Sequence, residues 1–354
     1  MKRSIAAASA VTIVAAAAAL GLWQTLRSPV TLRSAPRAVM GTRCELTIVV
    51  ARHRAGRGEE ALAAAAGALR DVEATMSHRL AGSALSRFNA AGPGEEVALP
   101  EELLLLLRRS DEIAHESDGA FDVTCRPVIE LWREGEKTDR EPAPQRIAEV
   151  LQRVGMRHLK LDGRGATKLI AGLEVDLGGI AKGYAVDQAT RVLQSCPGAS
   201  GGIVNAGGDL RCFGTNRDGQ PWRVGVQHPF REGLCGTLLL ADAAAATSGD
   251  YRRHFEIAGR RYSHIVDPRT GRPVQQTPSV TVVCLPAAGR EVSATDADAW
   301  ATALSVLGPA GLERLEKKAG FEAMIVTGTP ADPKIHTTKG FRRLLEGAGE
   351  IRLD

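Results

Sequence analysis

Apolar and polar positions repeat with a helical period in some parts of the chain and with a strand-like pattern in others. Residues 43–50 (RCELTIVV) are rich in apolar and β-branched side chains and predict a strand. Three segments carry apolar residues at helical spacing: residues 58–76, 100–117 and 142–155. Pro100 is typical of a helix start and Gly155 of a helix end. The N-terminal part should therefore pack helices against at least one strand.

The rest of the chain mixes short strand-like segments with helical ones. Helices are expected at residues 180–194 and 296–318. Strands are expected at residues 158–162, 173–178 and 322–328, with further short strands and turns between residues 201 and 286. Because strands and helices do not alternate strictly, the pattern favours an α+β fold with mixed or antiparallel sheets over a doubly wound parallel sheet.

The segment ATDADAWATALSVLG at residues 294–308 predicts a helix with two different faces. Thr295 or Asp296 is placed to cap it, and one face is apolar: Trp300, Leu304 and Leu307. The other face carries a carboxylate, a methyl group and two hydroxyls: Asp298, Ala301, Thr302 and Ser305. These are too few oxygens for calcium, but they suit Mg²⁺ if a phosphorylated ligand and water supply the remaining positions. Simple contact with water is the alternative interpretation.

A glycine pair stands where a strand is expected to turn into a helix, in VDLGGIAKGYAVD at residues 175–187. Gly178 and Gly179 let the backbone approach a ligand closely, and the first turn of a helix offers N–H groups to an anion. Lys182 adds a positive charge for a phosphate. The segment matches neither standard nucleotide-binding fingerprint, and a tight turn without a ligand also fits it.

Two other stretches carry polar residues whose role is open. In IVNAGGDL, at residues 203–210, Asn205 and Asp209 either bind a ligand or close a turn through the backbone, and the turn is favoured. His264 lies in an alternating segment that predicts a strand. A histidine there is either structural or an acid–base group, since its ordinary pKa suits proton transfer near neutrality.

The N-terminal segment, residues 1–28, has the pattern of an export signal. Lys2 and Arg3 precede an uncharged, Ala-rich run from Ser4 to Thr25. The run fits both a cleaved signal peptide and a retained inner-membrane anchor, because its length suffices to span a bilayer. We expect the remainder, one domain at residues 35–354 with two subdomains as an alternative, to work in the periplasm or at the membrane surface facing it.

Composition and charge narrow the classes of partner. The chain has 354 residues and a net charge of +4, and its Lys and Arg residues are scattered, which argues against a nucleic-acid surface. None of the six cysteines forms a CxxC pair, which argues against zinc and thioredoxin-type sites. One or two disulfides and buried free thiols both remain open.

Several stretches together resemble the FAD:protein FMN transferase family (the ApbE family). They occur in the order of the family's motifs after residue 35: VMGT (39–42), MSHRLAGSALSRFN (76–89), DGAFDVT (118–124), DLGGIAKGYAVD (176–187), NAGGD (205–209), TSGDYRR (247–253), SHIVDPRTG (263–271) and ATDADAWATAL (294–304). The resemblance implies a T-fold-like α+β catalytic domain and a particular reaction. Such enzymes use Mg²⁺ to cleave the pyrophosphate of FAD, attach FMN to a Thr or Ser hydroxyl of a target flavoprotein, and release AMP.

The resemblance also implies residue roles. FAD contacts would be Met40, Ala120, Phe121, Asp122, Asp176, Lys182 and Ile265, with Asn205 as a further candidate. Metal ligands would be Asp298, Thr302 and the carbonyls of Gly179 and Ala301. Asp298 and His264 would be the catalytic residues, the histidine by assisting proton removal from the acceptor hydroxyl.

One position departs from the family. Arg79 stands where the family usually has a Tyr that stacks on the flavin nucleotide, and a guanidinium can stack there or pair with a phosphate. Relatives differ at this position between FMN transfer and hydrolysis of FAD to FMN and AMP. An FAD pyrophosphatase and a non-catalytic FAD-binding protein are therefore the alternative hypotheses. Asp298→Ala is expected to abolish activity with little loss of fold.

Overall fold

The computed structural model describes residues 20–21, 25–36, 38–249, 254–275, 277–347 and 351. The predicted export segment, residues 1–28, lies outside these ranges except for residues 20–21 and 25–28. Residues 250–253 of the TSGDYRR motif also lie outside them. Within the described ranges, no helix is both long and apolar enough to cross a membrane.

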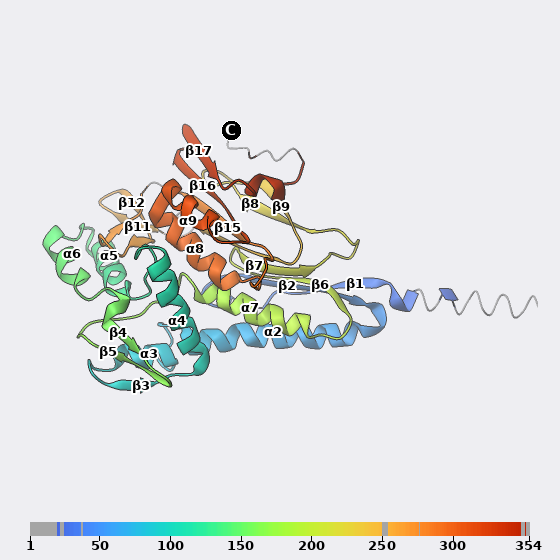
Figure 1. The fold of residues 1–354 in the computed structure, drawn as a ribbon, viewed down its shortest axis with the longest axis horizontal. Helices are drawn as coiled ribbons and strands as arrows, with labels where there is room; N and C mark the ends of the chain where they lie inside the picture. Colours follow the sequence, from blue (N-terminus) through green and yellow to red (C-terminus); the bar gives the residue numbers. More distant parts are fainter. Residues whose placement is uncertain are drawn as a thin grey trace, which may run out of the picture.

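An antiparallel sheet of eight strands runs through the molecule (Figure 1). Its strands, in chain order, are β1 (Pro29–Ser34), β2 (Cys44–Ala51), β6 (Ala199–Ala206), β7 (Asp209–Gly214), β10 (Ala243–Gly249), β15 (Ser279–Cys284), β16 (Phe321–Thr329) and β17 (Asp332–Thr337). Their order in the sheet is β1-β2-β6-β7-β10-β15-β16-β17. Strands distant in sequence are neighbours, so that Leu46 of β2 lies opposite Val204 of β6. The expected α+β class is confirmed.

Three helices cover one face of this sheet: α2 (Ala55–Met76), α7 (Ala181–Gln194) and α8 (Ala294–Leu307). Alternate strand residues point toward them, including Leu46, Val204 and Val280, because successive side chains of a strand face opposite sides. The other face packs against the ribbon of β8 (Trp222–Gln227) and β9 (Leu234–Leu240). The central strands β7 and β15 are therefore buried on both faces.

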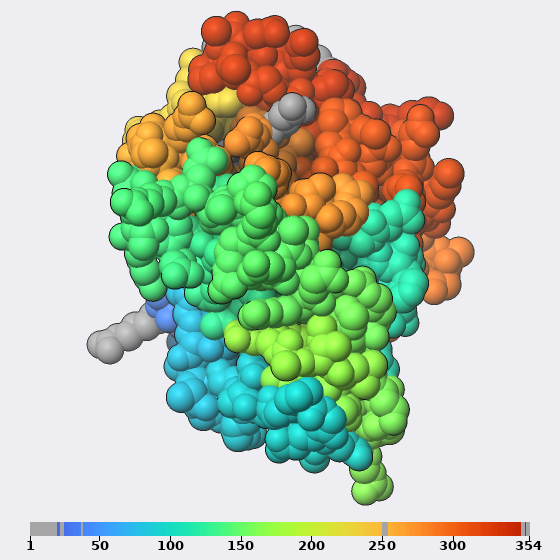
Figure 2. Space-filling model, turned by 90° about the vertical axis from the view of Figure 1, so that its left-hand side faces the viewer, coloured from blue at the N-terminus to red at the C-terminus, as the bar shows by residue number. Residues whose placement is uncertain are grey.

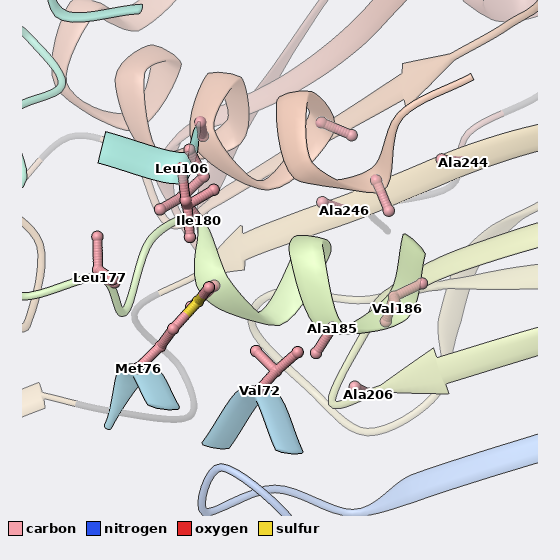
Figure 3. Close-up of a cluster of buried hydrophobic side chains, with 14 of the residues drawn as sticks. Val72, Met76, Leu106, Leu177, Ile180, Ala185, Val186, Ala206, Ala244 and Ala246 are labelled. Carbon is pink, nitrogen blue, oxygen red and sulfur yellow. The ribbon is translucent and has the colours of Figure 1, made fainter. Parts of the chain in front are cut away.

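The interior of the helix layer is made partly of small side chains (Figure 3). Val72 and Met76 of α2 point toward α7, and Ala244 and Ala246 lie on β10, which passes between α7 and α8 in this view. Methyl groups at such positions let helix and sheet backbones approach closely. This close packing brings the first turn of α7 beside α8.

A smaller group of elements lies at one end of the sheet: α3 (Ala84–Ala90), β3 (Glu96–Ala98), α4 (Glu101–Glu116), α5 (Arg126–Thr138), α6 (Pro144–Leu151), β4 (Leu159–Leu161), β5 (Gly165–Lys168), β11 (His254–Ile257), β12 (Arg260–Ser263), β13 (Val266–Asp267) and β14 (Arg272–Pro273). In Figure 2, the green segment that includes α5 and α6 lies between the blue N-terminal part and orange residues of the C-terminal half. Trp132, Phe255 and Tyr262 form a separate small core here. The Trp132 indole donates a hydrogen bond to the Gly271 carbonyl at 2.8 Å.

The strand expected at residues 173–178 does not form. Glu174 makes only an isolated bridge with Cys125. The side-chain amide of Asn89 pairs with both backbone groups of Val175, at 2.8 and 2.9 Å, and takes the place of a neighbouring strand. Side-chain amides of this kind satisfy an extended backbone outside a sheet. The segment before the glycine pair is thus extended but held by a helix side chain.

Several element boundaries also differ from the predictions. The helix expected at residues 142–155 ends at Leu151, and the helices at residues 126–138 and 84–90 were not expected. The additional strand β17 follows the strand expected at residues 322–328. Ser293, not Thr295 or Asp296, caps α8, because its hydroxyl accepts a hydrogen bond from the Asp296 N–H at 3.0 Å. All six cysteines are free thiols.

Candidate active site

The glycine pair and the late helix, more than a hundred residues apart in sequence, meet in the structure. A Cβ placed on Gly179 would lie 2.9 Å from the Thr302 hydroxyl oxygen and 3.4 Å from the Phe121 ring. Only a glycine permits this approach without a shift of its neighbours. Gly179, Phe121 and Thr302, from three different motifs, therefore converge on one place at the start of α7.

Helices α7 and α8 each receive a carboxylate from the other at their first turn. Asp298 of α8 accepts a hydrogen bond from the Gly183 N–H in α7 at 3.0 Å. Asp187 of α7 accepts from the Ala294 and Thr295 N–H groups at 3.0 and 2.9 Å. Carboxylates satisfy the free N–H groups at a helix start and complement its dipole. This exchange fixes the two helices relative to each other.

The backbones of the two helices also touch directly. A Cβ on Gly183 would lie 2.2 Å from the Ala294 carbonyl oxygen, a distance at which no side chain fits. The motif glycine at this position is therefore explained by packing against α8 rather than by a ligand. It places Asp298 within reach of the first turn of α7.

Lys182 stands between two buried carboxylates. Its ammonium donates to both oxygens of Asp298, at 3.0 and 3.1 Å, and to Asp209 at the start of β7. Burial and the Asp209 carboxylate raise the pKa of Asp298 to about 7, against the lowering effect of Lys182. Desolvation disfavours the charge on Lys182, but the two carboxylates outweigh it and raise the lysine pKa. Lys182 is thus held by protein carboxylates.

The polar face predicted for α8 is only partly available. Asp298 is 2% exposed and Ser305 1% exposed, and Ser305 donates its hydroxyl to the Ala301 carbonyl at 2.9 Å. Thr302 is half-buried, with its hydroxyl 3.5 Å from that of Ser248. Protein rather than water or ligand covers the far end of this face, so only the turn from Asp298 to Thr302 meets the glycine pair.

Burial corrects one sequence-based expectation about Asp298. Its carboxylate lies between α7 and α8 rather than on a side facing only the ligand. Removal of the whole side chain leaves the Gly183 N–H without its partner, which costs about 1–3 kcal/mol for a buried group. Because Asp298→Ala would add this cost to the loss of charge, an isosteric variant is needed to test the charge alone.

The segment around residue 121 is held by its own acidic residue. The Asp122 carboxylate accepts from the Thr124 N–H and hydroxyl, at 2.8 and 2.6 Å, and from the Met156 N–H at 3.2 Å. Burial raises the pKa of Asp122 despite these hydrogen bonds. Ala120 and Phe121 are both buried, at 1% and 3% exposure. Asp122 thus fixes the loop that presents Phe121 to Gly179.

Asp176 joins two of the motifs. Its carboxylate lies 3.4 Å from the His78 ring and accepts from the Gly178 N–H at 2.8 Å. Burial alone would raise its pKa, but the contacts with His78 and Gly178 lower it. His78 precedes Arg79, whose side chain is exposed in the loop after α2. Asp176 therefore connects the loop that carries Arg79 to the glycine pair. The sequence context of His78 did not indicate that it takes part in this connection.

The remaining candidates lie on loops and turns. Met40 has a φ of 54° and donates its N–H to Glu73 of α2 at 2.8 Å. His264 was expected within a strand, but it lies in a bend between β12 and β13 and is half-buried. Ile265, 9% exposed, accepts from the Val274 N–H at 2.9 Å. The small core around Trp132 therefore supports the segment that carries His264.

Asn205 lies away from this group of residues. Its side-chain oxygen accepts from the Gly208 N–H at 2.9 Å, which closes the β6–β7 turn as the turn interpretation expects. It lines a cavity of about 660 Å³ between the sheet and the β8–β9 ribbon, together with Thr47 and Thr247. Asp209 points to the opposite side, toward Lys182. The NAGGD motif therefore places Asn205 on one face of the sheet and Asp209 on the other.

The residues at the α7–α8 contact have the donors that a hard divalent cation prefers. Around Gly179 they offer the Asp298 carboxylate, the Thr302 hydroxyl and backbone carbonyls, all oxygen ligands. Within the described part of the chain, no cluster of three or more His, Cys, Asp or Glu side chains is suited to a metal. A cation at Asp298 and Thr302 would thus depend on carbonyls and on a phosphorylated ligand.

Comparison with known proteins decides the family. The ApbE family model matches residues 40–325, which include every candidate residue from Met40 to Thr302. The chain belongs to the ApbE family. A FAD:protein FMN transferase from Vibrio cholerae is 38% identical over 245 residues, covering 68% of this chain and 71% of the relative. The FAD:protein FMN transferase from Escherichia coli K12 is 32% identical over 254 residues, covering 69% of this chain and 70% of the relative.

Solved structures of ApbE proteins have the same fold. The flavin transferase ApbE from Vibrio cholerae superposes with a TM-score of 0.75 at 31% identity, over 90% of this chain and 99% of that one. The ApbE protein from Thermotoga maritima superposes with a TM-score of 0.76 at 30% identity, over 90% of this chain and 100% of that one. The resemblance inferred from the eight motifs is therefore confirmed at the level of family and fold.

Proposed function

We propose that this ApbE-family chain is an Mg²⁺-dependent FAD:protein FMN transferase that modifies a Thr or Ser of a target flavoprotein. The relatives named for this activity support the proposal. The single observation that carries it is the contact of Gly179 with Thr302 beside the buried Asp298 carboxylate. That contact brings the backbone of the turn before α7 next to the oxygen donors of α8.

Each candidate residue has a defined task in the proposed reaction. Asp298, Thr302 and the carbonyls of Gly179 and Ala301 would hold Mg²⁺, which would supply positive charge to neutralise the diphosphate of FAD. Asp122 and Asp176 position the loops that flank the glycine pair. The acceptor hydroxyl oxygen forms a bond to the FMN phosphorus, the bond to the AMP oxygen breaks, and AMP leaves. His264 takes the hydroxyl proton.

Arg79 favours one alternative, hydrolysis of FAD to FMN and AMP without a protein acceptor. Its side chain is exposed, and the Ser77 hydroxyl accepts a hydrogen bond from its backbone N–H at 3.2 Å. The family usually has a Tyr at this position, as described above. In the hydrolysis reaction, water would replace the hydroxyl of the target protein. The transferase is preferred because the relatives at 38% and 32% identity bear that name.

The experiment that separates these reactions measures AMP and protein-bound FMN. The soluble chain is mixed with FAD and Mg²⁺, with and without a flavoprotein fragment that carries an acceptor Thr. AMP release that depends on the acceptor, with FMN bound to the fragment, supports the transferase. Equal AMP release without acceptor supports the pyrophosphatase. No AMP release in either mixture supports a non-catalytic FAD-binding protein.

His264→Gln is expected to slow FMN transfer by roughly 100-fold or more while leaving the Kd for FAD within about threefold. Glutamine preserves much of the side-chain volume but cannot take a proton at neutral pH. Transfer is followed by covalent flavin fluorescence and FAD binding by calorimetry. Exposed His115 on α4 provides the control, since His115→Gln should change neither. Equal losses of transfer and binding would make His264 a binding residue.

Gly179→Ala is expected to weaken Mn²⁺ binding about tenfold or more, a size typical of disturbing groups around a metal. The new methyl group would lie 2.9 Å from the Thr302 hydroxyl and displace it. Mn²⁺ titration of the FAD-bound protein by electron paramagnetic resonance measures the effect. Gly163→Ala is the matched control, because a Cβ there meets nothing within 4 Å. Unchanged binding would remove Thr302 and Gly179 from the metal site.

We further propose that residues 1–28 direct the chain out of the cytoplasm. Lys2 and Arg3 before an uncharged run support this assignment. Fractionation of a Gram-negative host that expresses the full chain, with mass measurement of the product, tests it. A full-length cytoplasmic product contradicts export. A shortened periplasmic product supports a signal peptide, and a full-length product in the inner membrane supports an anchor.

A further inference from the structure

Lys182 divides its single positive charge between carboxylates on two different elements. Asp209 begins β7, and its side chain is 4% exposed. Asp298 lies on α8, and its side chain is 2% exposed. The lysine ammonium donates to both. Within this trio the formal charges sum to −1, and Arg211 forms a separate pair with Asp187 that is neutral as a whole.

A bound divalent cation and the lysine ammonium need the same oxygens. Both Asp298 oxygens receive hydrogen bonds from Lys182, at 3.0 and 3.1 Å, and one of them also accepts from the Gly183 N–H. Like charges a few ångströms apart in a buried site repel strongly. When a cation binds, the Lys182 ammonium must therefore give up part of its hydrogen bonding to Asp298. It can do so only if another carboxylate still pairs with it.

We propose that Asp209 is a positioning residue that retains the Lys182 ammonium on the β7 side and so keeps Asp298 available to a divalent cation. The inference rests on the proposed metal site at Asp298 and Thr302, and it gives the last residue of the NAGGD motif a function. In this proposal Asp209 is a ligand of neither the cation nor FAD. It acts through the lysine, because its own oxygen is the second acceptor of that ammonium.

A purely structural role for Asp209 is the competing explanation. Asp209 directly follows the Gly207–Gly208 turn between β6 and β7, and in this explanation its loss affects only that hairpin. The two explanations differ in their dependence on Lys182. If Asp209 only braces the turn, removal of the lysine charge has no power to rescue an Asp209 variant. If Asp209 restrains the lysine, removal of the lysine charge restores cation binding.

The test measures the Kd for Mn²⁺ by electron paramagnetic resonance at saturating FAD, established separately for each variant. Asp209→Asn is expected to raise this Kd about tenfold or more, because the trio loses its net negative charge. The double variant Asp209→Asn with Lys182→Met regains a net charge of −1, and its Kd is expected to return to within about threefold of wild type. Asp218→Asn, an exposed loop residue, removes the same charge elsewhere and should have no effect.

Each outcome decides between the explanations. An Asp209→Asn variant with a lower melting temperature and an unchanged Kd for Mn²⁺ would overturn the proposal, as would a double variant no better than the single one. Failure of the proposed function gives a different result, because the wild-type chain would then bind no Mn²⁺ with FAD present. Circular dichroism of each variant shows that the comparison is made between folded proteins.

Discussion

Asp298→Asn is expected to lower the rate of AMP release from FAD roughly a thousandfold, the upper size for losing one electrostatic contact in an active site. The amide keeps the shape of the carboxylate and can still accept a hydrogen bond from the Gly183 N–H. It has no charge to hold a divalent cation. Lys182 retains Asp209 as a partner, so the folded state should survive. The effect should therefore appear in catalysis and cation binding.

The measurement is the rate of AMP release at saturating FAD and Mg²⁺, corrected for the folded fraction of each variant. Asp296→Asn is the matched control, since it removes the same charge two residues earlier on α8. Asp296 pairs with Arg109 and Arg290 at 2.8 and 2.9 Å, away from the glycine pair. That control should lose stability but retain its rate per folded molecule. A wild-type rate for Asp298→Asn would show that the metal assignment is mistaken.

The motif residues near the proposed metal site could be found from the sequence because their signals are local. A carboxylate and a hydroxyl four residues apart on a helix, and two glycines before another helix, are readable without a structure. The structure adds that Gly179 and Thr302 are in contact. That contact depends on how α7 and α8 pack, and no spacing within either segment encodes it.

Two expected strand positions, residues 173–178 and His264, differ in the structure. Residues 173–178 have a strand-like pattern, yet the Asn89 side chain from another motif pairs with Val175 and replaces the neighbouring strand. His264 alternates with apolar residues, but β12 ends at Ser263 and β13 begins at Val266, so the residue lies in the bend between them. At Val175, a partner distant in sequence therefore decides the conformation.

Asp187 connects α7 to residues distant in sequence. Of the replacements considered, that of Asp187 should lower the free energy of unfolding most. The residue is 2% exposed, and its carboxylate accepts from Arg211 at 2.8 Å and from two N–H groups at the start of α8. Asp187→Ala leaves the buried Arg211 charge unpaired, which costs about 3–5 kcal/mol. A native state stable by about 5–15 kcal/mol loses a large part of its margin.

Thermal unfolding followed by circular dichroism should show a melting temperature for Asp187→Ala that is lower by roughly 10 °C. Asp187→Asn should lose less, because the amide oxygen still accepts from the start of α8. Replacing Arg211 by Met in the Asp187→Ala background should recover part of the loss, since the unpaired charge is then absent. If Asp187→Ala melts with the wild type, the exchange of carboxylates between α7 and α8 does not hold the helices together. The position of Asp298 beside Gly183 would then need another cause.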